Sequence, residues 1–493
     1  MNIPTARMEG KEKTNFEKWL SYLGVPIAAI VFALLFTMRT PTELTLQGKS
    51  AIAVFLAVFV LWVSQAVPTF VSSLIAIVLL TLTSAWDEKS VLGVFGYDVI
   101  WLMISAFIIT SGMTKTGLAN RVALWLVSTF GKTARLALIS LIIVNFVIAF
   151  IVPSTTARAA LMLPIALLVA QAYGAQPGKS NFGKLIMIQE LQVNNISTSA
   201  ILTATAPQIM AVGLIKDLTG YNVSWSEWFI ASLPVALCTM IISYLVGLMI
   251  FEPEVSVPVM EDRGNDGIGK LKEQLRKMGP MTKEEKKALF IFCLTVFLWA
   301  TDKWHVQMFG FKISLVMVAI ISATLFYLPF IGLISWKDTK IPWDLMIFSA
   351  GAYAVGMALD KSGAAAWALK AVFGSLDLGK IGFFPLYMIV IFIAIFSHLV
   401  FTSKTVRTAI LIPAVIGIAN AAGINPIALA LPASFTIADS ITLPPHCKPN
   451  LIFYSTGYFN VLDQFFYGMI VLIGKWLLLG IASLTWFKII GIC

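Results

Sequence analysis

The sequence predicts an all-α polytopic membrane protein with about eleven transmembrane helices, two re-entrant hairpins and an internal inverted repeat. The mean hydropathy is +0.87, 58% of the 493 residues are hydrophobic and only 12% are charged, a composition that soluble folds do not tolerate. The stretch PSTTARAALMLPIA at 153–166 also returns, half a chain later, as TSKTVRTAILIPAV at 402–415. Two related halves in an apolar chain are a common architecture of membrane transporters.

The first quarter of the chain predicts simple membrane helices. The apolar run at 19–38 has no obvious small-residue cleavage site, so we interpret it as a retained helix with a cytoplasmic amino terminus. Further apolar segments follow at 50–66, 70–84 and 99–113. Residues 117–130 place Arg121 among Leu, Val and Trp, a pattern typical of a helix that lies at the membrane interface.

Each copy of the repeated stretch predicts a re-entrant hairpin. Short apolar pieces at 136–152 and 157–173 are separated only by the loop 154–156, and the pieces at 384–401 and 406–421 by the loop 403–405. Each piece is marginal for a full span, so we expect both loops to lie buried near the middle of the membrane.

An apolar segment that is broken in its middle follows each hairpin. The first, at 185–215, contains TATAPQ at 203–208, and the second, at 427–457, contains TLPPHCKPN at 442–450. Proline lacks a backbone donor and clashes with the preceding turn, so both helices should unwind there and line a cavity. The residues expected to face it are Thr205, Pro207, Gln208, Cys447, Lys448, Pro449 and Asn450.

The repeat extends upstream, because LMISAFIITSGMTKTG at 102–117 resembles LMIFSAGAYAVGMALDKSG at 345–363. Spans at 227–251, 287–301, 312–335, 341–358 and 462–487 complete the prediction. An odd number of crossings between the hairpins inverts the second half relative to the first. Eleven crossings from a cytoplasmic amino terminus place the carboxyl terminus on the extracytoplasmic side. Basic residues gather on the predicted cytoplasmic side, including the linker 252–286, so the net charge of +10 needs no nucleic acid partner.

The hairpin tips predict an anion site. Helix ends with unpaired amides favour negative charge, and hydroxyls add neutral donors. Two such loops facing each other suit the two ends of a dicarboxylate. The hydroxyls are those of Ser154, Thr155, Thr156, Ser403 and Thr405; the alternative is that they only cap short helices.

Five basic residues fall inside the predicted membrane segments: Arg158, Arg407, Lys404, Lys448 and Lys475. Such charges usually pair or serve function. Lys475 has no motif around it and is interpreted as a residue that snorkels, while the other four are candidate fixed charges of the site. Glu190 and Asp439 are possible partners that would make the arginines structural clamps. His446 and His398 flank the second loop and are more often packed than ligating residues.

Other classes of function find little support. The four cysteines are far apart, and the three histidines form no HExxH motif, so we expect no metal, no cofactor and no enzyme activity. An anion channel with the loops as a selectivity ring stays a rival of a secondary transporter.

The paired loops, the broken helices and the crossing pattern together resemble the divalent anion/sodium symporter superfamily over essentially the whole chain. STTARAALMLPI and HCKPNLIFYSTGYF are most similar to its exchanger branch, the bacterial citrate/succinate antiporters and plastid 2-oxoglutarate/malate translocators. The resemblance implies a homodimer that works as an elevator. It assigns the scaffold to 1–133 and 287–378, and the transport domain to 134–251 and 379–493.

The sequence departs from the family at the loops. The usual Ser-Asn-Thr is Ser154-Thr155-Thr156 in the first and Ser403-Lys404-Thr405 in the second, and a Pro-Pro-Asn of sodium-coupled members is Lys448-Pro449-Asn450. Fixed lysines cannot leave the site as sodium does. We therefore predict sodium-independent exchange of dicarboxylates such as succinate, malate, fumarate or 2-oxoglutarate in the cytoplasmic (inner) membrane; the alternative is a sodium-coupled di- or tricarboxylate symporter.

Overall fold

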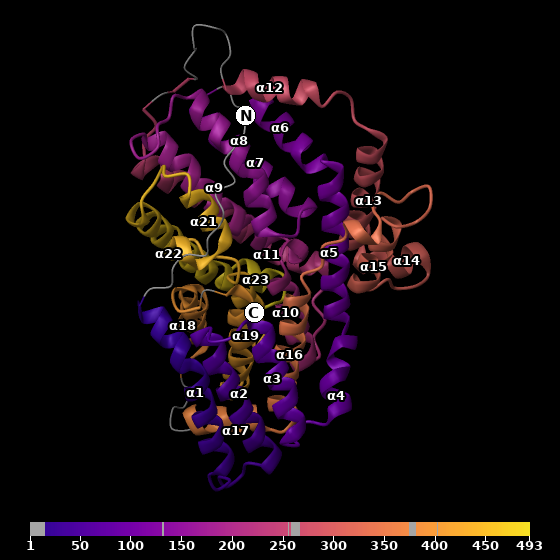
Figure 1. Cartoon of the computed structure of the whole chain (residues 1–493), viewed down its shortest axis with the longest axis vertical. Coiled ribbons are helices and arrows are strands. Elements are labelled where there is room, and N and C mark those ends of the chain that lie inside the picture. The colour runs from indigo at the N-terminus through magenta and orange to yellow at the C-terminus, as the bar shows by residue number, and fades with distance from the viewer. Residues whose placement is uncertain (1–14, 131–132, 255, 258–266, 374–380, 402) are drawn as a thin grey trace. The chain divides into compact units, whose positions relative to one another are not determined.

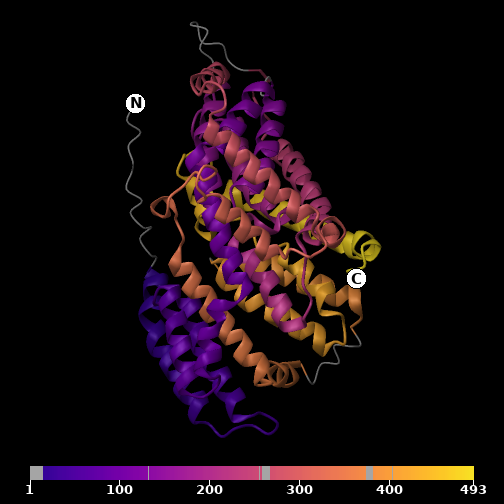
Figure 2. The ribbon, with the colours of Figure 1, turned by 90° about the vertical axis from the view of Figure 1, so that its right-hand side faces the viewer.

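A computed structural model describes residues 15–130, 133–254, 256–257, 267–373, 381–401 and 403–493. All regular structure in these residues is helical. They divide into two compact units, one from Met1–Phe95 and Pro342–Ala371 and one from Gly96–Ile341 and Val372–Cys493. Figures 1 and 2 show the chain from two directions.

The first unit is a small helical bundle in which α1 packs beside α2, and α3 beside both α2 and α16. The α3–α16 contact is close, because Ser73 donates a hydrogen bond to the carbonyl of Phe348 (3.1 Å) and an added Cβ at Gly351 would collide with Ser73. Its helices are α1 (Asn15–Thr37), α2 (Leu46–Ser64), α3 (Thr69–Leu82), α4 (Glu88–Gly93), α16 (Trp343–Lys361) and α17 (Ala364–Phe373); the short η1 (Val94–Gly96) follows α4.

The second unit holds the two hairpins and both broken helices. Its first half has α5 (Asp98–Thr116), α6 (Leu118–Phe130), α7 (Ala134–Ile151), α8 (Thr155–Ala172), α9 (Asn181–Ala200), η2 (Leu202–Ala204), α10 (Ala206–Thr219) and α11 (Trp225–Ile250). The middle has α12 (Gly267–Lys277), α13 (Lys283–Ala300), η3 (Asp302–Trp304), α14 (His305–Phe309), α15 (Leu315–Leu325) and η4 (Trp336–Asp338). The last part has α18 (Phe383–Phe396), η6 (Ser397–Leu399), α19 (Lys404–Ala421), α20 (Pro426–Ser434), η7 (Pro444–His446), α21 (Lys448–Tyr454), α22 (Val461–Leu484) and α23 (Trp486–Ile489).

The helices of the second unit repeat in order: α7 to α11 correspond to α18 to α22. The two closing helices, α11 and α22, pack against each other and both begin with a reciprocal capping box, Ser224 with Glu227 and Asn460 with Asp463. The repeats are also interlocked, because α10 packs against α19 and α21 packs against α8. Each half-helix that follows a break therefore lies on the hairpin of the other repeat.

The protein is an all-helical polytopic membrane protein, as the sequence predicts. Seven helices among the described residues are long and apolar enough to cross a membrane, or eight if the bent pair α13 and η3–α14 is one span. Four shorter apolar helices also occur, at Tyr22–Thr37, Thr69–Leu82, Leu315–Leu325 and Phe383–Leu399. The number of eleven crossings, the depth of the hairpins and the side of each terminus stay predictions.

Two helices end earlier than expected. The segment predicted at 312–335 is helical only to Leu325, because Pro329 supplies no backbone donor and Phe330 has a positive φ of 69°, so the chain turns back there. The second broken segment already leaves the helix at Ser434, well before 442–450, after Pro432 in its last turn.

The predicted amphipathic segment 117–130 forms α6, and Arg121 on it clasps the predicted linker. Its Nε donates to Glu285 Oε1 at 2.7 Å, and Nη1 donates to the carbonyl of Gly279 at 2.7 Å. The linker 252–286 holds α12, and its residues 255 and 258–266 lie outside the described residues, as do 1–14 of the predicted scaffold and its boundary at 378/379. The division into scaffold and transport domain stays a prediction.

Candidate functional site

The two hairpin tips have the same local geometry. Ser154 is the N-cap of α8 and accepts a hydrogen bond from the amide of Ala157 at 3.3 Å, and Ser403 is the N-cap of α19 and accepts from the amide of Val406 at 3.3 Å. Each hydroxyl keeps its own proton for a further bond. Capping and a role at an anion site are therefore compatible, since each tip presents the positive end of an 18-residue helix.

The remaining tip residues differ in what they reach. Thr155 is buried, and its carbonyl accepts from Asn194 at 2.8 Å, while Thr156 and Thr405 are half-buried. Lys404 opens α19 and donates from Nζ to Asn195 Oδ1 at 2.5 Å. Asn195 lies on α9, so this bond joins the hairpin of the second repeat to the broken helix of the first.

Asn195 was not predicted from the sequence, and it connects three segments. Its side-chain amide also donates to the carbonyl of Leu191 at 2.7 Å and lies 3.9 Å from the Cys447 sulfur, which is on the second break. The sequence signal was the polar run QELQVNN inside an apolar segment.

The two breaks have the same local backbone geometry. Thr205 and Cys447 are the N-caps of α10 and α21 with nearly equal backbone angles, φ −159°, ψ 144° and φ −160°, ψ 156°. Pro207 and Pro449 lie in the first turn of these helices, where a missing amide costs nothing. The prolines thus begin the downstream half-helices.

At each break, an amide side chain of the downstream half-helix donates a hydrogen bond to a backbone carbonyl on the upstream side. Gln208 donates to the carbonyl of Thr198 at 3.0 Å, and Asn450 donates to the carbonyl of Ser440 at 2.7 Å. These two bonds occupy corresponding places in the repeats, because the partners in each pair are ten residues apart. Both side chains are fully buried, so they stabilise the unwound backbone.

The two arginines join the hairpins to the segments that precede the breaks. Arg158 donates from Nε to Asn194 Oδ1 and from Nη2 to the Asn194 carbonyl, both at 3.0 Å, and it also bonds Thr198. Arg407 donates from Nη2 to the Thr436 carbonyl at 3.0 Å and to that of Ile437. Both guanidinium groups have no solvent exposure.

Glu190 and Asp439, the possible partners of the two arginines, form other contacts. Glu190 accepts a bond from Asn145 at 2.7 Å, and Asp439 forms an ion pair with Lys475 at 2.5 Å. The interpretation of Lys475 as a snorkelling residue was wrong, because its side chain has no exposure and also donates to the carbonyl of Phe435 at 3.0 Å. Neighbours in sequence did not reveal this pair, since 36 residues separate its members.

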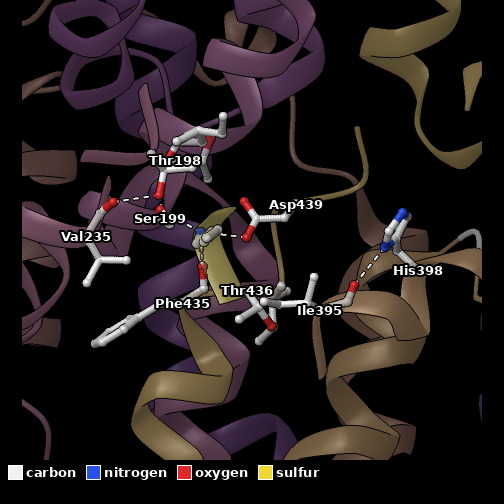
Figure 3. Close-up of polar contacts among 12 residues, drawn as sticks. Thr198, Ser199, Val235, Ile395, His398, Phe435, Thr436 and Asp439 are labelled. Carbon is white, nitrogen blue, oxygen red and sulfur yellow. Dashed lines mark hydrogen bonds and ion pairs between the residues drawn. The ribbon is translucent and has the colours of Figure 1, made fainter. Parts of the chain in front are cut away.

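The two histidines are packed side chains: His398 lies in η6, before the second hairpin tip, and His446 lies in η7, at the second break. His398 contacts the carbonyl of Ile395 (2.7 Å) and the hydroxyl of Thr442 (2.8 Å), and His446 lies 3.3 Å from the same hydroxyl. Their rings meet edge to face at 5.2 Å. Figure 3 shows His398 directed to Ile395, away from Asp439.

Lys448 differs from Lys404 in its surroundings. It is the first residue of α21 and its side chain is exposed, whereas its neighbours Pro449 and Asn450 are buried. The two lysines thus differ: Lys404 donates to Asn195 of the other repeat, and the Lys448 side chain is exposed.

Comparison with known proteins agrees with this architecture. The family model described as "Sodium:sulfate symporter transmembrane region" matches residues 17–493. The L-tartrate/succinate antiporter of Escherichia coli (strain K12) is 26% identical over 506 residues, covering 96% of this chain and 99% of the relative. The sodium-dependent dicarboxylate transporter SdcS of Staphylococcus saprophyticus is 25% identical and covers 89% and 86%, and a membrane protein of Cupriavidus necator is 28% identical and covers 90% and 87%.

Solved structures show the same fold at low identity. The YdaH transporter of Alcanivorax borkumensis matches with a TM-score of 0.51 and 14% identity, and MtrF of Neisseria gonorrhoeae with 0.55 and 13%; each covers 95% of this chain and 97% of the other. The resemblance found in the sequence is confirmed, and the chain is a transporter and not an enzyme. It belongs to the family of the sodium:sulfate symporter transmembrane region, the divalent anion/sodium symporters.

Proposed function

We propose that the chain is a sodium-independent antiporter that exchanges dicarboxylates across the cytoplasmic membrane by an elevator motion. The names of two relatives, a tartrate/succinate antiporter and a sodium-dependent dicarboxylate transporter, support the substrate class. The two capped hairpin tips support it as well, because each offers a helix amino terminus and hydroxyl donors to one carboxylate.

One observation carries exchange as the mode of transport: the bond from Lys404 to Asn195 between the two repeats. The ammonium is covalently fixed where a sodium-coupled carrier would release its cation. Moving an uncompensated charge through the membrane costs at least several kcal/mol. A carrier loaded with a dianion crosses more easily, so net transport without a counter-substrate is disfavoured.

The direct substrate contacts are proposed for Lys404 and the hydroxyls of the tips. The arginines are assigned to bracing, because each donates to a backbone carbonyl of the broken helix in its own repeat, Arg158 to Asn194 and Arg407 to Thr436. Gln208 and Asn450 hold the breaks in shape for the same reason. Lys448, exposed at the start of α21, supplies a further positive charge beside the second break.

The second candidate is a sodium-coupled symporter. The similarity to SdcS favours it, and carbonyls at the breaks would then bind the cation. Under both proposals the resemblance to the family implies a homodimer, which mass photometry in detergent tests directly.

The test is uptake of labelled succinate into proteoliposomes that are preloaded with unlabelled succinate or left empty, each with sodium or choline outside. Exchange predicts uptake only into loaded vesicles, at equal rates in both salts. Sodium-dependent accumulation in empty vesicles establishes the symporter and removes the fixed-charge role of Lys404. Current without counter-substrate would indicate a channel.

A further inference from the structure

A buried ammonium lies where two half-helices end. Lys475 Nζ of α22 is 2.5 Å from Asp439 Oδ2, 3.0 Å from the carbonyl of Phe435 and 3.4 Å from the hydroxyl of Ser199. The Lys475 and Asp439 side chains both have 0% exposure. Figure 3 shows Ser199, Phe435 and Asp439 grouped around this point.

The oxygens around the ammonium are those of a cation site. Phe435 is the C-cap of α20, and Ser199 lies in the last turn of α9, so two negative helix ends converge there. Carboxyl ends of half-helices coordinate sodium in other transporters. Among the described residues, Asp439 Oδ1 has no hydrogen-bond partner, which leaves a further oxygen for a small ion.

In the first repeat, the position that corresponds to Lys475 is not a basic residue. The capping boxes that begin α11 and α22 set the register of the two helices, and this register aligns Lys475 with Thr239. The Thr239 hydroxyl donates a hydrogen bond to the carbonyl of Val235, in its own helix, at 2.6 Å. The fold of the repeat therefore does not require a charge there, and Lys475 is a feature of the second half alone.

We propose that Lys475 is a tethered cation, whose ammonium permanently fills a monovalent-cation site formed by Asp439, Phe435 and Ser199. The site lies between the two broken helices, with Ser199 on the first and Phe435 and Asp439 on the second. The inference concerns the stability of the fold and holds for an exchanger and for a symporter alike.

The test replaces Lys475 by alanine and asks whether a free monovalent cation stabilises the variant. Lys475→Ala opens space beside Asp439, so its melting temperature in detergent should be higher in sodium or lithium than in N-methylglucamine by about 2 °C or more. The unmodified chain should show no such difference. Lys475→Met, which keeps the space filled, and Lys475→Ala with Asp439→Asn, which removes the carboxylate, should both lose the dependence.

A melting temperature of Lys475→Ala that is equal in all salts overturns the proposal. Within the described part of the chain, Arg407 has two buried donors without hydrogen-bond partners, and its movement onto Asp439 would produce this result. Fluorescence-detected size-exclusion chromatography tests Lys475→Ala without purification, on crude extracts of a fluorescent-protein fusion solubilised in parallel in each salt. A monodisperse peak of this variant only with small cations supports the tethered cation. The absence of folded variant in every salt contradicts it. Neither result depends on succinate transport.

Discussion

Arginine suits positions 158 and 407 because one guanidinium can serve several acceptors at once. Arg158 reaches both the side chain and the carbonyl of Asn194, and Arg407 reaches the corresponding carbonyl of Thr436. Thr436 lies just beyond the end of α20, where carbonyls lack helical partners, whereas Asn194 lies within α9, six residues before its end. Each arginine therefore joins the hairpin of its repeat to the broken helix of the same repeat.

Replacing Arg158 by lysine should destabilise the protein without changing its substrate affinity. One ammonium cannot satisfy the acceptors that Arg158 serves, so we expect a loss of about 2–4 kcal/mol. The measurement is thermal unfolding in detergent, with Lys448→Gln as the exposed control that leaves the melting temperature unchanged. Unaltered stability together with a raised KM for succinate would mean that Arg158 binds substrate instead.

The two loop lysines should differ in their effect on coupling. Lys404 contacts Asn195 and Lys448 is exposed, so Lys404→Asn should permit some net or cation-dependent uptake, whereas Lys448→Pro alone should change it little. The double variant should show the largest gain. Uptake of labelled succinate into empty proteoliposomes measures this, and intact exchange with no gain in any variant counts against the fixed-charge argument.

At the scale of elements, the breaks depend more on the buried amides than on the prolines. Pro449 stands in the first turn of α21, where proline is already compatible with the helix. Pro449→Ala should therefore cost at most about 1 kcal/mol. Asn450→Leu removes two bonds that the amide donates, to the carbonyls of Ser440 and Leu443, and one that Oδ1 accepts from the Cys447 thiol, and should cost about 1–3 kcal/mol.

Melting temperatures of these two variants decide between the explanations, and Gln208→Leu is the matched change in the first repeat. It removes a single bond, so its effect should be smaller than that of Asn450→Leu. A larger loss from Pro449→Ala than from Asn450→Leu would show that the proline itself maintains the break.

The elements of this fold are readable from sequence where they repeat. The hairpin tips appear because Ser154 and Ser403 recur in a matching context, and periodic apolar runs give most of the helices. Partners that meet only after folding are not readable in this way. The bonds from Lys404 to Asn195 and from Lys475 to Asp439 join different helices, and no local pattern selects one acceptor among many.

At the scale of the whole molecule, two ion pairs test the predicted elevator motion, because one links the two predicted domains and the other lies within one of them. Lys216 on α10 pairs with Asp98 on α5 and so joins the predicted transport domain to the predicted scaffold. Lys184 on α9 pairs with Asp463 on α22, and both belong to the predicted transport domain. An elevator motion must break the first pair in each cycle and leave the second intact.

Cross-links by a short bifunctional methanethiosulfonate at these two pairs test the motion, because such a reagent spans the distance that a lysine side chain bridges and a disulfide would not. In a chain whose four native cysteines are replaced by serine and whose exchange is verified, Asp98→Cys with Lys216→Cys should stop exchange when cross-linked and recover it with reductant. Lys184→Cys with Asp463→Cys should keep exchange when cross-linked, because both positions belong to the predicted transport domain. All four positions are partly exposed, so the reagent reaches them. Full exchange through the cross-linked first pair would exclude sliding of α10 past α5, and with it the assigned domain boundaries.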